Sequence, residues 1–469
     1  LFQLYMEPFI HLHVHTQYSL LDGQASIDAL IDKAQKDGMN AIAVTDHGNM
    51  FGIKEFFNKV SKKNGKPLGA IKDLEKEQKA LKGKEALSTE EQARLQEIPS
   101  LIEAEKKKIF KPIIGCECYC ARNGRHNKTA KEDRSGYHLI ILAKNLKGYK
   151  NLIKMVSISW TEGFYGRPRI DHELLEKYHE DLIVCSACLG GEIPQHIMHD
   201  RIDKAEESIL WFKKLFGEDY YLEMQRHETH DPNADCTTYP KQQEVNKVLI
   251  ELARKHNVKL IATNDVHFVN QEDAEAHDRL ICLSTGKDLD DPTRMRYSKQ
   301  EWMKTTAEMN AIFADIPEAL SNTLEIADKV DFYSIDSGPI MPTFAIPEDF
   351  GTEESYREKF SEQDLFEEFT RDENGNVVLS EEDAKDKIKK LGGYDKLYRI
   401  KLEADYLRKL TYDGAKVCYG DNLNDEVRER LDFELHIMKT MGFPGYFLIV
   451  QDFIAAAREE LGVSVGPGR

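Results

Sequence analysis

The sequence lacks long apolar runs and a recognisable leader. No apolar stretch approaches the roughly 18 residues of a membrane-spanning helix, so we expect no membrane partner. Residues 1–5 lack the basic and apolar regions of a signal peptide, and we expect Met6 to be the natural start and residues 1–7 to be a leader or vector remnant. Eight cysteines without a secretory leader indicate free thiols in a reducing compartment, and hence a cytoplasmic protein.

An excess of positive charge is also absent. The 64 Lys and Arg residues face 82 Asp and Glu residues, which gives a net charge of −18. This balance argues against non-specific coating of DNA by the whole chain, because phosphate binding needs clustered Lys and Arg. Two local basic stretches, 144–154 and 167–169, are the exceptions. The length of 469 residues and a hydrophobic fraction of 41% predict several globular domains of roughly 150 residues each.

Histidines, in contrast, are concentrated near the N-terminus. His11, His13 and His15 alternate with apolar residues, and Asp22 and His47 follow. Alternate residues of a strand share one face, so three imidazoles are predicted to point the same way. Each buried neutral ring would need a partner for both of its nitrogens. A divalent metal ion satisfies several rings at once, so the pattern favours a metal site over core packing.

Later segments carry further ligand-type residues beside short apolar runs. Glu117, Cys188, Asp265 and His267 follow or end such runs, whereas His138 opens one. Helical stretches at 27–37, 203–216 and 241–256 separate the runs, and this alternation predicts a parallel sheet of the α/β class. In barrels of this type functional residues gather at the carboxyl ends of the strands. His138 is the exception and the least secure ligand on this argument.

The remaining cysteines favour packing over redox chemistry. Cys185 and Cys188 have the spacing of a redox or zinc-ribbon pair, but the sequence holds no second pair. Cys116, Cys118 and Cys120 alternate along one predicted strand and are expected to lie in the core.

Taken together, these motifs resemble the PHP (polymerase and histidinol phosphatase) domain, and the wider chain is similar to the C family of bacterial replicative polymerases, the DNA polymerase III alpha subunits. The terminal motif is specific to the polymerases, since free-standing PHP phosphatases lack it. The resemblance implies a PHP-type (β/α)7 distorted barrel followed by an α+β partial palm domain. The segments that carry it are 9–51, 111–120, 137–152, 165–171, 185–194, 241–330, 441–450 and 466–469.

The resemblance also implies two or three divalent metal ions, with zinc, manganese or iron as candidates. Asp22, Glu117 or Asp265 would bridge them. Some relatives have lost several ligands, and their domain is then structural, but all positions here keep ligand-type residues. His11 matches no ligand position and is assigned to the core or to support behind the ligands. The implied ligands are His13, His15, Asp22, His47, Glu117, His138, Cys188, Asp265 and His267.

The expected domain boundaries are 8–287 for the PHP domain and 288–469 for the start of the palm. Gly466, Gly468 and Arg469 would hold a nucleoside triphosphate, with 463–465 as the preceding strand. By resemblance, the carboxylates that bind magnesium for polymerisation lie beyond this loop, so we expect this chain alone not to extend a primer.

Two segments interrupt the main pattern. Residues 66–110 are charged, carry an apolar heptad pattern and contain a capping box at 88–91, which predicts an inserted helical hairpin outside the resemblance. A solvated decoration and a partner-binding arm both stay open for this hairpin. Residues 347–395 are acidic and poor in apolar residues, and we expect an exposed, partly mobile insertion. Residues 372–376 hint at a calcium loop, but the glycine is misplaced and no twelfth-position Glu follows.

Three functions compete at this point. In the first, the chain is part of a replicative polymerase whose PHP domain hydrolyses the 3′ end of DNA. In the second, the PHP domain is a structural metal module that braces the polymerase. In the third, it is a free-standing phosphoesterase, which the terminal motif disfavours. The resemblance implies DNA, deoxynucleoside triphosphates, a proofreading subunit and a sliding clamp as partners.

Overall fold

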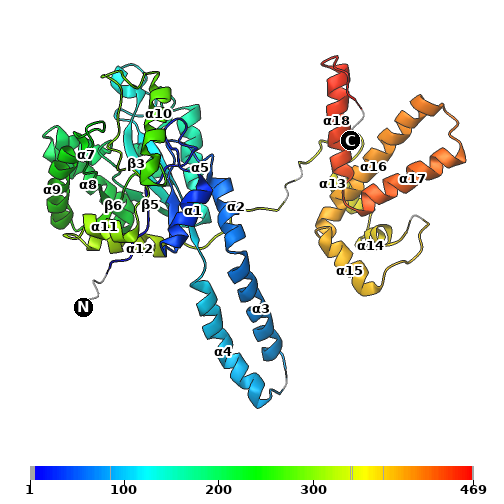
Figure 1. Cartoon of the computed structure of the whole chain (residues 1–469). Helices are drawn as coiled ribbons and strands as arrows, with labels where there is room; N and C mark the ends of the chain where they lie inside the picture. The colour runs from blue at the N-terminus through cyan, green and yellow to red at the C-terminus, as the bar shows by residue number, and fades with distance from the viewer. Residues whose placement is uncertain (1–5, 85, 339, 341, 373, 467–469) are drawn as a thin grey trace. The chain divides into compact units, whose positions relative to one another are not determined.

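The computed structural model describes residues 6–466 except 85, 339, 341 and 373, and it divides into two compact units (Figure 1). The first runs from Leu1 to Ile335 and the second from Asp336 to Arg469. The first unit extends past the boundary expected at residue 287. The reason is packing: Met303, Phe313, Leu320 and Ile326 all belong to the core of the first unit.

The first unit is built on a seven-stranded mixed sheet with the order β1-β2-β3-β5-β6-β7, and β4 pairs with β2. Neighbouring strands run parallel except β3, which is antiparallel to both β2 and β5. The expectation of a fully parallel sheet is therefore wrong for β3. The strands are β1 (Ala41–Val44), β2 (Lys111–Cys120), β3 (Tyr137–Ala143), β4 (Arg169–Ile170), β5 (Leu182–Cys185), β6 (Tyr220–Met224) and β7 (Lys259–Ala262).

The histidine-rich segment 11–15 joins the two edges of this curled sheet. On one side the backbone N–H of Ala43 donates to His11, at 2.9 Å. On the other side His15 donates to Val266 at 2.7 Å, and Val266 donates back to His13 at 3.1 Å. The predicted distorted barrel is thus a curled mixed sheet that this short segment closes.

Helices cover the sheet because each presents one apolar face to the core (Figure 1). In α5, for example, Leu152, Met155 and Val156 are buried, and in α8 Ile209 and Phe212 are buried. The covering helices are α1 (Ile27–Lys36), α2 (Ile53–Lys63), α5 (Leu146–Thr161), α6 (His172–Tyr178), α7 (Glu192–Met198), α8 (Ile202–Phe216), α9 (Thr238–His256), α10 (Ala274–Thr285), α11 (Thr306–Ile312) and α12 (Glu318–Lys329).

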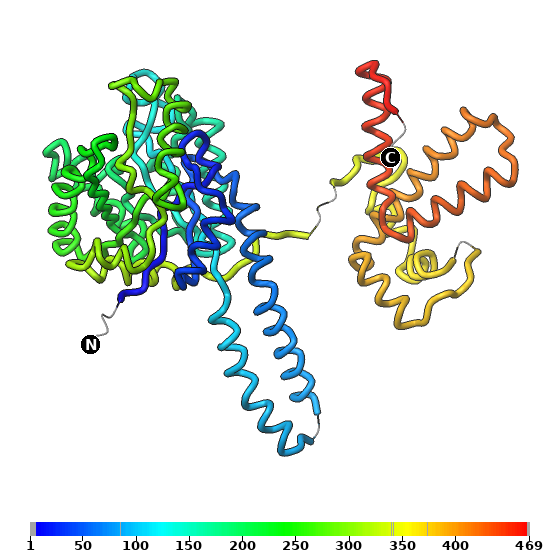
Figure 2. The backbone as a smooth tube through the Cα atoms, viewed as in Figure 1, coloured from blue at the N-terminus to red at the C-terminus, as the bar shows by residue number. Residues whose placement is uncertain are grey.

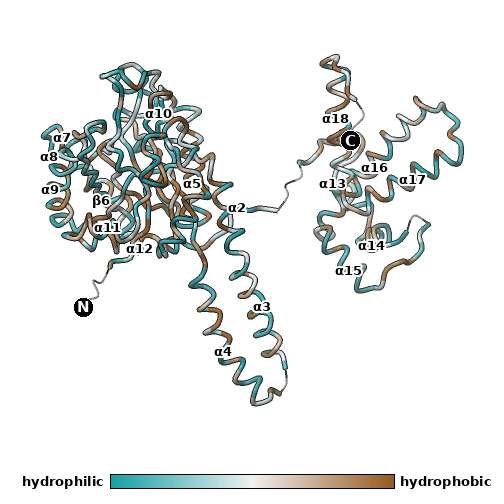
Figure 3. Tube along the Cα trace, viewed as in Figure 1, coloured by the Kyte–Doolittle hydropathy of each residue, from teal (hydrophilic) through white to brown (hydrophobic). Residues whose placement is uncertain are grey.

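The predicted insertion is a pair of helices, α3 (Gly65–Lys82) and α4 (Thr89–Lys106), that contact each other and extend away from the sheet (Figure 2). The capping box at Ser88 and Glu91 is formed as the sequence predicts. Hydrophilic residues are frequent along both helices (Figure 3). At the base, the Asn64 side chain donates to the Phe110 carbonyl at 2.7 Å and accepts from its N–H at 2.9 Å. This buried amide therefore fastens the two ends of the insertion together.

The described part of the second unit is helical, apart from one bridge between Arg371 and Val377. The acidic stretch 347–395 was expected to be an exposed insertion. This expectation is wrong, because Tyr356, Leu365 and Ile388 are buried in the core of this unit. The strand expected at 463–465 is wrong: this segment has no strand pairing, and Val463 donates to the carbonyl of Ala457 in α18. The helices are α13 (Glu353–Lys359), α14 (Glu362–Thr370), α15 (Glu381–Lys390), α16 (Tyr394–Tyr419), α17 (Asp425–Thr440) and α18 (Pro444–Glu459).

Among the described residues, no helix combines the length and the apolar character that crossing a membrane requires.

We expect Asn64→Ala to lower the free energy of unfolding by about 1–3 kcal/mol, because it leaves two buried backbone groups of Phe110 without partners. Urea denaturation followed by circular dichroism measures the change. Asn58, an exposed residue of α2, provides the matched control, and Asn58→Ala should change stability by less than about 0.5 kcal/mol. Equal stability of both variants would contradict the role given to Asn64.

Candidate metal centre

All nine predicted ligands converge at one edge of the curled sheet. His47 follows β1, Cys188 follows β5, and Asp265 and His267 follow β7. His138 opens β3, but β3 runs antiparallel to its neighbours, so its start lies where the parallel strands end. His138 precedes its apolar run, unlike the other predicted ligands beside such runs, because β3 runs in the opposite direction to its neighbours.

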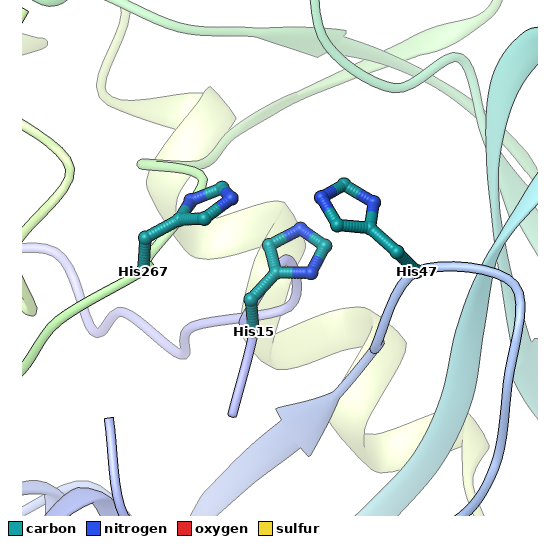
Figure 4. A group of neighbouring side chains, drawn as sticks. All are labelled: His15, His47 and His267. Carbon is teal, nitrogen blue, oxygen red and sulfur yellow. The ribbon is translucent and has the colours of Figure 1, made fainter. Parts of the chain in front are cut away.

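Three imidazoles from three separate segments form one face of the cluster, His15, His47 and His267 (Figure 4). The ring centroids of His15 and His47 are 4.0 Å apart, and those of His15 and His267 are 4.3 Å apart. One nitrogen from each ring lies within 4.8 Å of the other two. This spacing suits a single cation held by three nitrogens.

The carboxylate of Glu117 lies between two further groups. One contains His13 and His15, and the other contains His138 and Cys188. Glu117 Oε2 lies 3.4 Å from His15 Nε2, and Glu117 Oε1 lies 2.7 Å from His138 Nδ1. A carboxylate placed between two ligand sets can share its two oxygens between two cations, so Glu117 has the position of a bridging ligand.

Asp265 and Asp22 complete the cluster. Asp265 Oδ1 lies 3.0 Å from His13 Nε2 and 3.2 Å from His15 Nε2. Asp22 Oδ2 lies 2.9 Å from His47 Nε2, and the Tyr297 hydroxyl donates to Asp22 Oδ1 at 2.9 Å. All three predicted bridging carboxylates therefore face imidazole nitrogens.

Several buried polar atoms of this cluster have no hydrogen-bond partner among the described residues. Buried polar groups are normally paired, and an unpaired group costs stability. Divalent cations would satisfy these atoms together, so the donor set fits the metals that the sequence implies. The atoms are His13 Nε2, His15 Nε2, His47 Nδ1, Glu117 Oε2, Asp265 Oδ1 and His267 Nε2.

A second layer of contacts fixes the ring orientations. His13 Nδ1 lies 2.6 Å from Glu223 Oε1, His15 Nδ1 lies 2.9 Å from Ser19 Oγ, and His267 Nδ1 lies 2.8 Å from the carbonyl of Asp265. These partners leave the Nε2 atoms turned toward the cluster, as metal-binding histidines require. Glu223 was assigned no role from the sequence. A single Glu inside the buried strand β6 nevertheless indicates a carboxylate that needs a polar partner.

The cluster balances charge internally. Burial lowers the pKa of His267, but Asp22 and Asp265 outweigh this effect and raise the pKa to about 9. Burial raises the pKa of Glu117, but His138 and His47 outweigh it and hold the pKa well below its ordinary value. The carboxylates therefore stay ionised, which is the form that binds cations.

Two predicted groups lie outside this cluster. His11 is buried, and its Nε2 lies 2.7 Å from the carbonyl of Lys304. It therefore packs in the core and belongs to no ligand group among the described residues. Gly466 is exposed. Gly468 and Arg469 fall outside the described residues, so the triphosphate loop stays a prediction.

Comparison with known families agrees with this arrangement. The PHP domain matches residues 11–227, which hold seven of the nine clustered residues. The bacterial DNA polymerase III alpha NTPase domain matches residues 405–469. The protein named DNA polymerase III subunit alpha from Borreliella burgdorferi is 40% identical over 98% of this chain. Over nearly its whole length the chain is similar to alpha subunits of bacterial DNA polymerase III.

Further alpha subunits show a similar relation to this chain. The alpha subunits of Campylobacter jejuni and Thermus aquaticus are 33% and 34% identical over 99% and 98% of this chain. This chain covers 31% of the Borreliella protein, 32% of the Campylobacter protein and 34% of the Thermus protein. It therefore spans about a third of the length of these curated relatives.

We expect Glu117→Ala to remove about two metal ions per chain, because this carboxylate belongs to two ligand groups, whereas Cys188→Ala should remove about one. Inductively coupled plasma mass spectrometry of protein purified without chelator measures the content. The exposed Glu228 provides the matched control, and Glu228→Ala should keep the wild-type content. Less than one ion per chain in the wild type would contradict the metal centre itself.

Proposed function

We propose that the PHP domain of this chain hydrolyses phosphodiester bonds at the 3′ end of DNA, as part of a replicative polymerase. The observation that carries the proposal is the position of Glu117 between two ligand groups. When bound, a pair of divalent cations activates a water molecule and neutralises charge on a phosphate. The candidate ions are zinc, manganese and iron, because the donors are nitrogen, oxygen and sulfur.

The protein's own contribution is to hold the predicted metal ligands in place and to orient them. Glu223 and Ser19 fix the rings of His13 and His15, and Tyr297 fixes Asp22. We assign no separate protein base. His13, His15 and Glu117 are fully buried, whereas the side chains of Asp22 and His138 are 23% and 25% exposed. A phosphate would therefore approach from the side of Asp22 and His138.

Exposed aromatic rings beside this opening support a nucleic-acid substrate. Phe51, Trp160 and Phe164 are 58%, 43% and 46% exposed, and the rings of Trp160 and Phe164 stack with centroids 5.5 Å apart. The Trp160 indole donates to the carbonyl of Gly48 at 2.8 Å, directly beside His47. Aromatic rings of this kind stack with unpaired bases.

A positive charge lies close to the same opening. The guanidinium of Arg167 lies 5.6 Å from the ring of Tyr119, and that ring stacks on His47. Arg167 is exposed, so its charge is free to attract a phosphate backbone. Stacking and charge beside one opening favour a single-stranded 3′ end over a small phosphomonoester.

The two alternatives have weaker support. A purely structural metal module would not need an opening to solvent at Asp22 and His138. A free-standing phosphoesterase conflicts with similarity to polymerase subunits over 98% of the chain. For the whole protein we propose templated DNA synthesis from deoxynucleoside triphosphates with magnesium, together with a proofreading subunit and a sliding clamp as partners.

We expect His13→Ala and Asp265→Ala each to abolish 3′ exonuclease activity, since both residues line the metal-binding groups. Release of labelled nucleotides from a 3′-labelled single strand is the measurement. His230→Ala, at an exposed site in the same unit, should keep full activity. If the wild type and both cluster variants digest DNA equally, a contaminating enzyme explains the activity and the proposal fails.

We expect Trp160→Ala to weaken binding of an oligothymidylate about tenfold, because base stacking on an aromatic ring contributes about 1–3 kcal/mol. Fluorescence anisotropy of a labelled strand measures the affinity, and metal content should stay unchanged. Trp160→Phe should bind nearly as well. Phe433, 40% exposed in the second unit, is the matched control, and weaker binding by Phe433→Ala alone would place the DNA elsewhere.

A further inference from the structure

A second group of potential metal ligands lies outside the nine-residue centre. Cys120, His172 and Glu192 each offer one ligand atom, and these atoms lie within 4.8 Å of one another. Cys120 ends β2, whereas His172 and Glu192 are the first residues of α6 and α7. Three separate segments thus bring sulfur, nitrogen and oxygen donors to one point.

The orientation of these donors is fixed by their neighbours. The His172 ring stacks on Trp211 with centroids 4.0 Å apart and an interplanar angle of 15°. Its Nε2 lies 3.2 Å from one oxygen of Glu192, and the other oxygen accepts a hydrogen bond from Ser208 at 2.6 Å. Cys120 is buried and forms no disulfide. Such pre-positioning lowers the cost of assembling a metal site.

A cavity of about 380 Å³ opens on two members of this group, and His172, Glu192 and His196 line it. The buried Nδ1 of His196 has no hydrogen-bond partner among the described residues. The other charged residues of the cavity have partners. Asp171 and Glu173 each lie 3.0 Å from Arg125, and Arg122 lies over the ring of Tyr137. The imidazole of His196 therefore lines the same cavity as His172 and Glu192, with one nitrogen unpaired within the described part of the chain.

We propose that Cys120, His172 and Glu192 form a second, separate divalent-metal site of the zinc class. Mixed sulfur, nitrogen and oxygen donors in a tetrahedral set are typical of zinc. On binding, the thiol of Cys120 loses its proton to solvent and the sulfur forms a bond to the metal, with no change of oxidation state. Burial, Glu192 and Asp171 raise the pKa of the Cys120 thiol.

The second metal site would brace the first. Cys120 lies three residues after Glu117 on the same strand, and Glu192 follows closely after Cys188. A cation held by Cys120 and Glu192 would connect the strand and the loop that carry these two predicted ligands. The role is structural, and it does not depend on the proposed nuclease activity.

Cobalt substitution tests the site in the full chain. The background variant carries Cys188→Ser, Cys236→Ser and Cys418→Ser, which removes the thiol of the main centre and both exposed cysteines. Titration with Co²⁺ should then still produce the near-ultraviolet absorption of a thiolate–cobalt bond. Adding Cys120→Ser should abolish this absorption. Adding Cys118→Ser, at a buried cysteine of the same strand that belongs to no ligand group, should leave it intact.

Metal content gives an independent readout. His172→Ala changes a side chain that is 41% exposed, so folding should be preserved, and it should remove about one ion per chain and weaken the cobalt absorption at least tenfold. Glu192→Gln should do the same. Absorption that persists in the Cys120→Ser variant, or an unchanged metal content in His172→Ala, would overturn the proposal.

Discussion

The burial of the Glu117 carboxylate is the constraint on which the first unit depends. Glu117 is fully buried, and such a charge is costly unless opposite charges and donors surround it. Imidazole nitrogens from different parts of the chain lie within 3.5 Å of this carboxylate, those of His13, His15, His47 and His138. The sheet must therefore curl until these segments meet.

The segment that closes the sheet also carries two of the predicted metal ligands. The segment 11–15 supplies His13 and His15 to the cluster through its side chains and joins β1 to the segment after β7 through its backbone. A change that loosened this segment would open the sheet and scatter the ligands together. The closure of the sheet and the geometry of the candidate metal centre thus depend on the same five residues.

The sequence indicated a metal site through residue types and their spacing, and its resemblance to the PHP domain implied nine ligands. The structure brings these side chains together, and their role as ligands stays a prediction. The sequence could not predict the direction of β3, since strand direction depends on long-range pairing, and His138 consequently looked like an exception. Glu223 was missed because its role is a contact with His13, 210 residues away. The segment 463–465 has the composition of a strand but no partner strand, and it folds back toward α18 instead.

The paired ends of the hairpin have an evolutionary consequence. Asn64 and Phe110 hold the base closed, so the barrel is insensitive to what lies between them. The entropic cost of a longer loop grows only slowly, by about 0.6 kcal/mol for each doubling of its length. This position can therefore accept, exchange or lose whole segments while the curled sheet stays the same, which makes it a natural place for lineage-specific domains to arise.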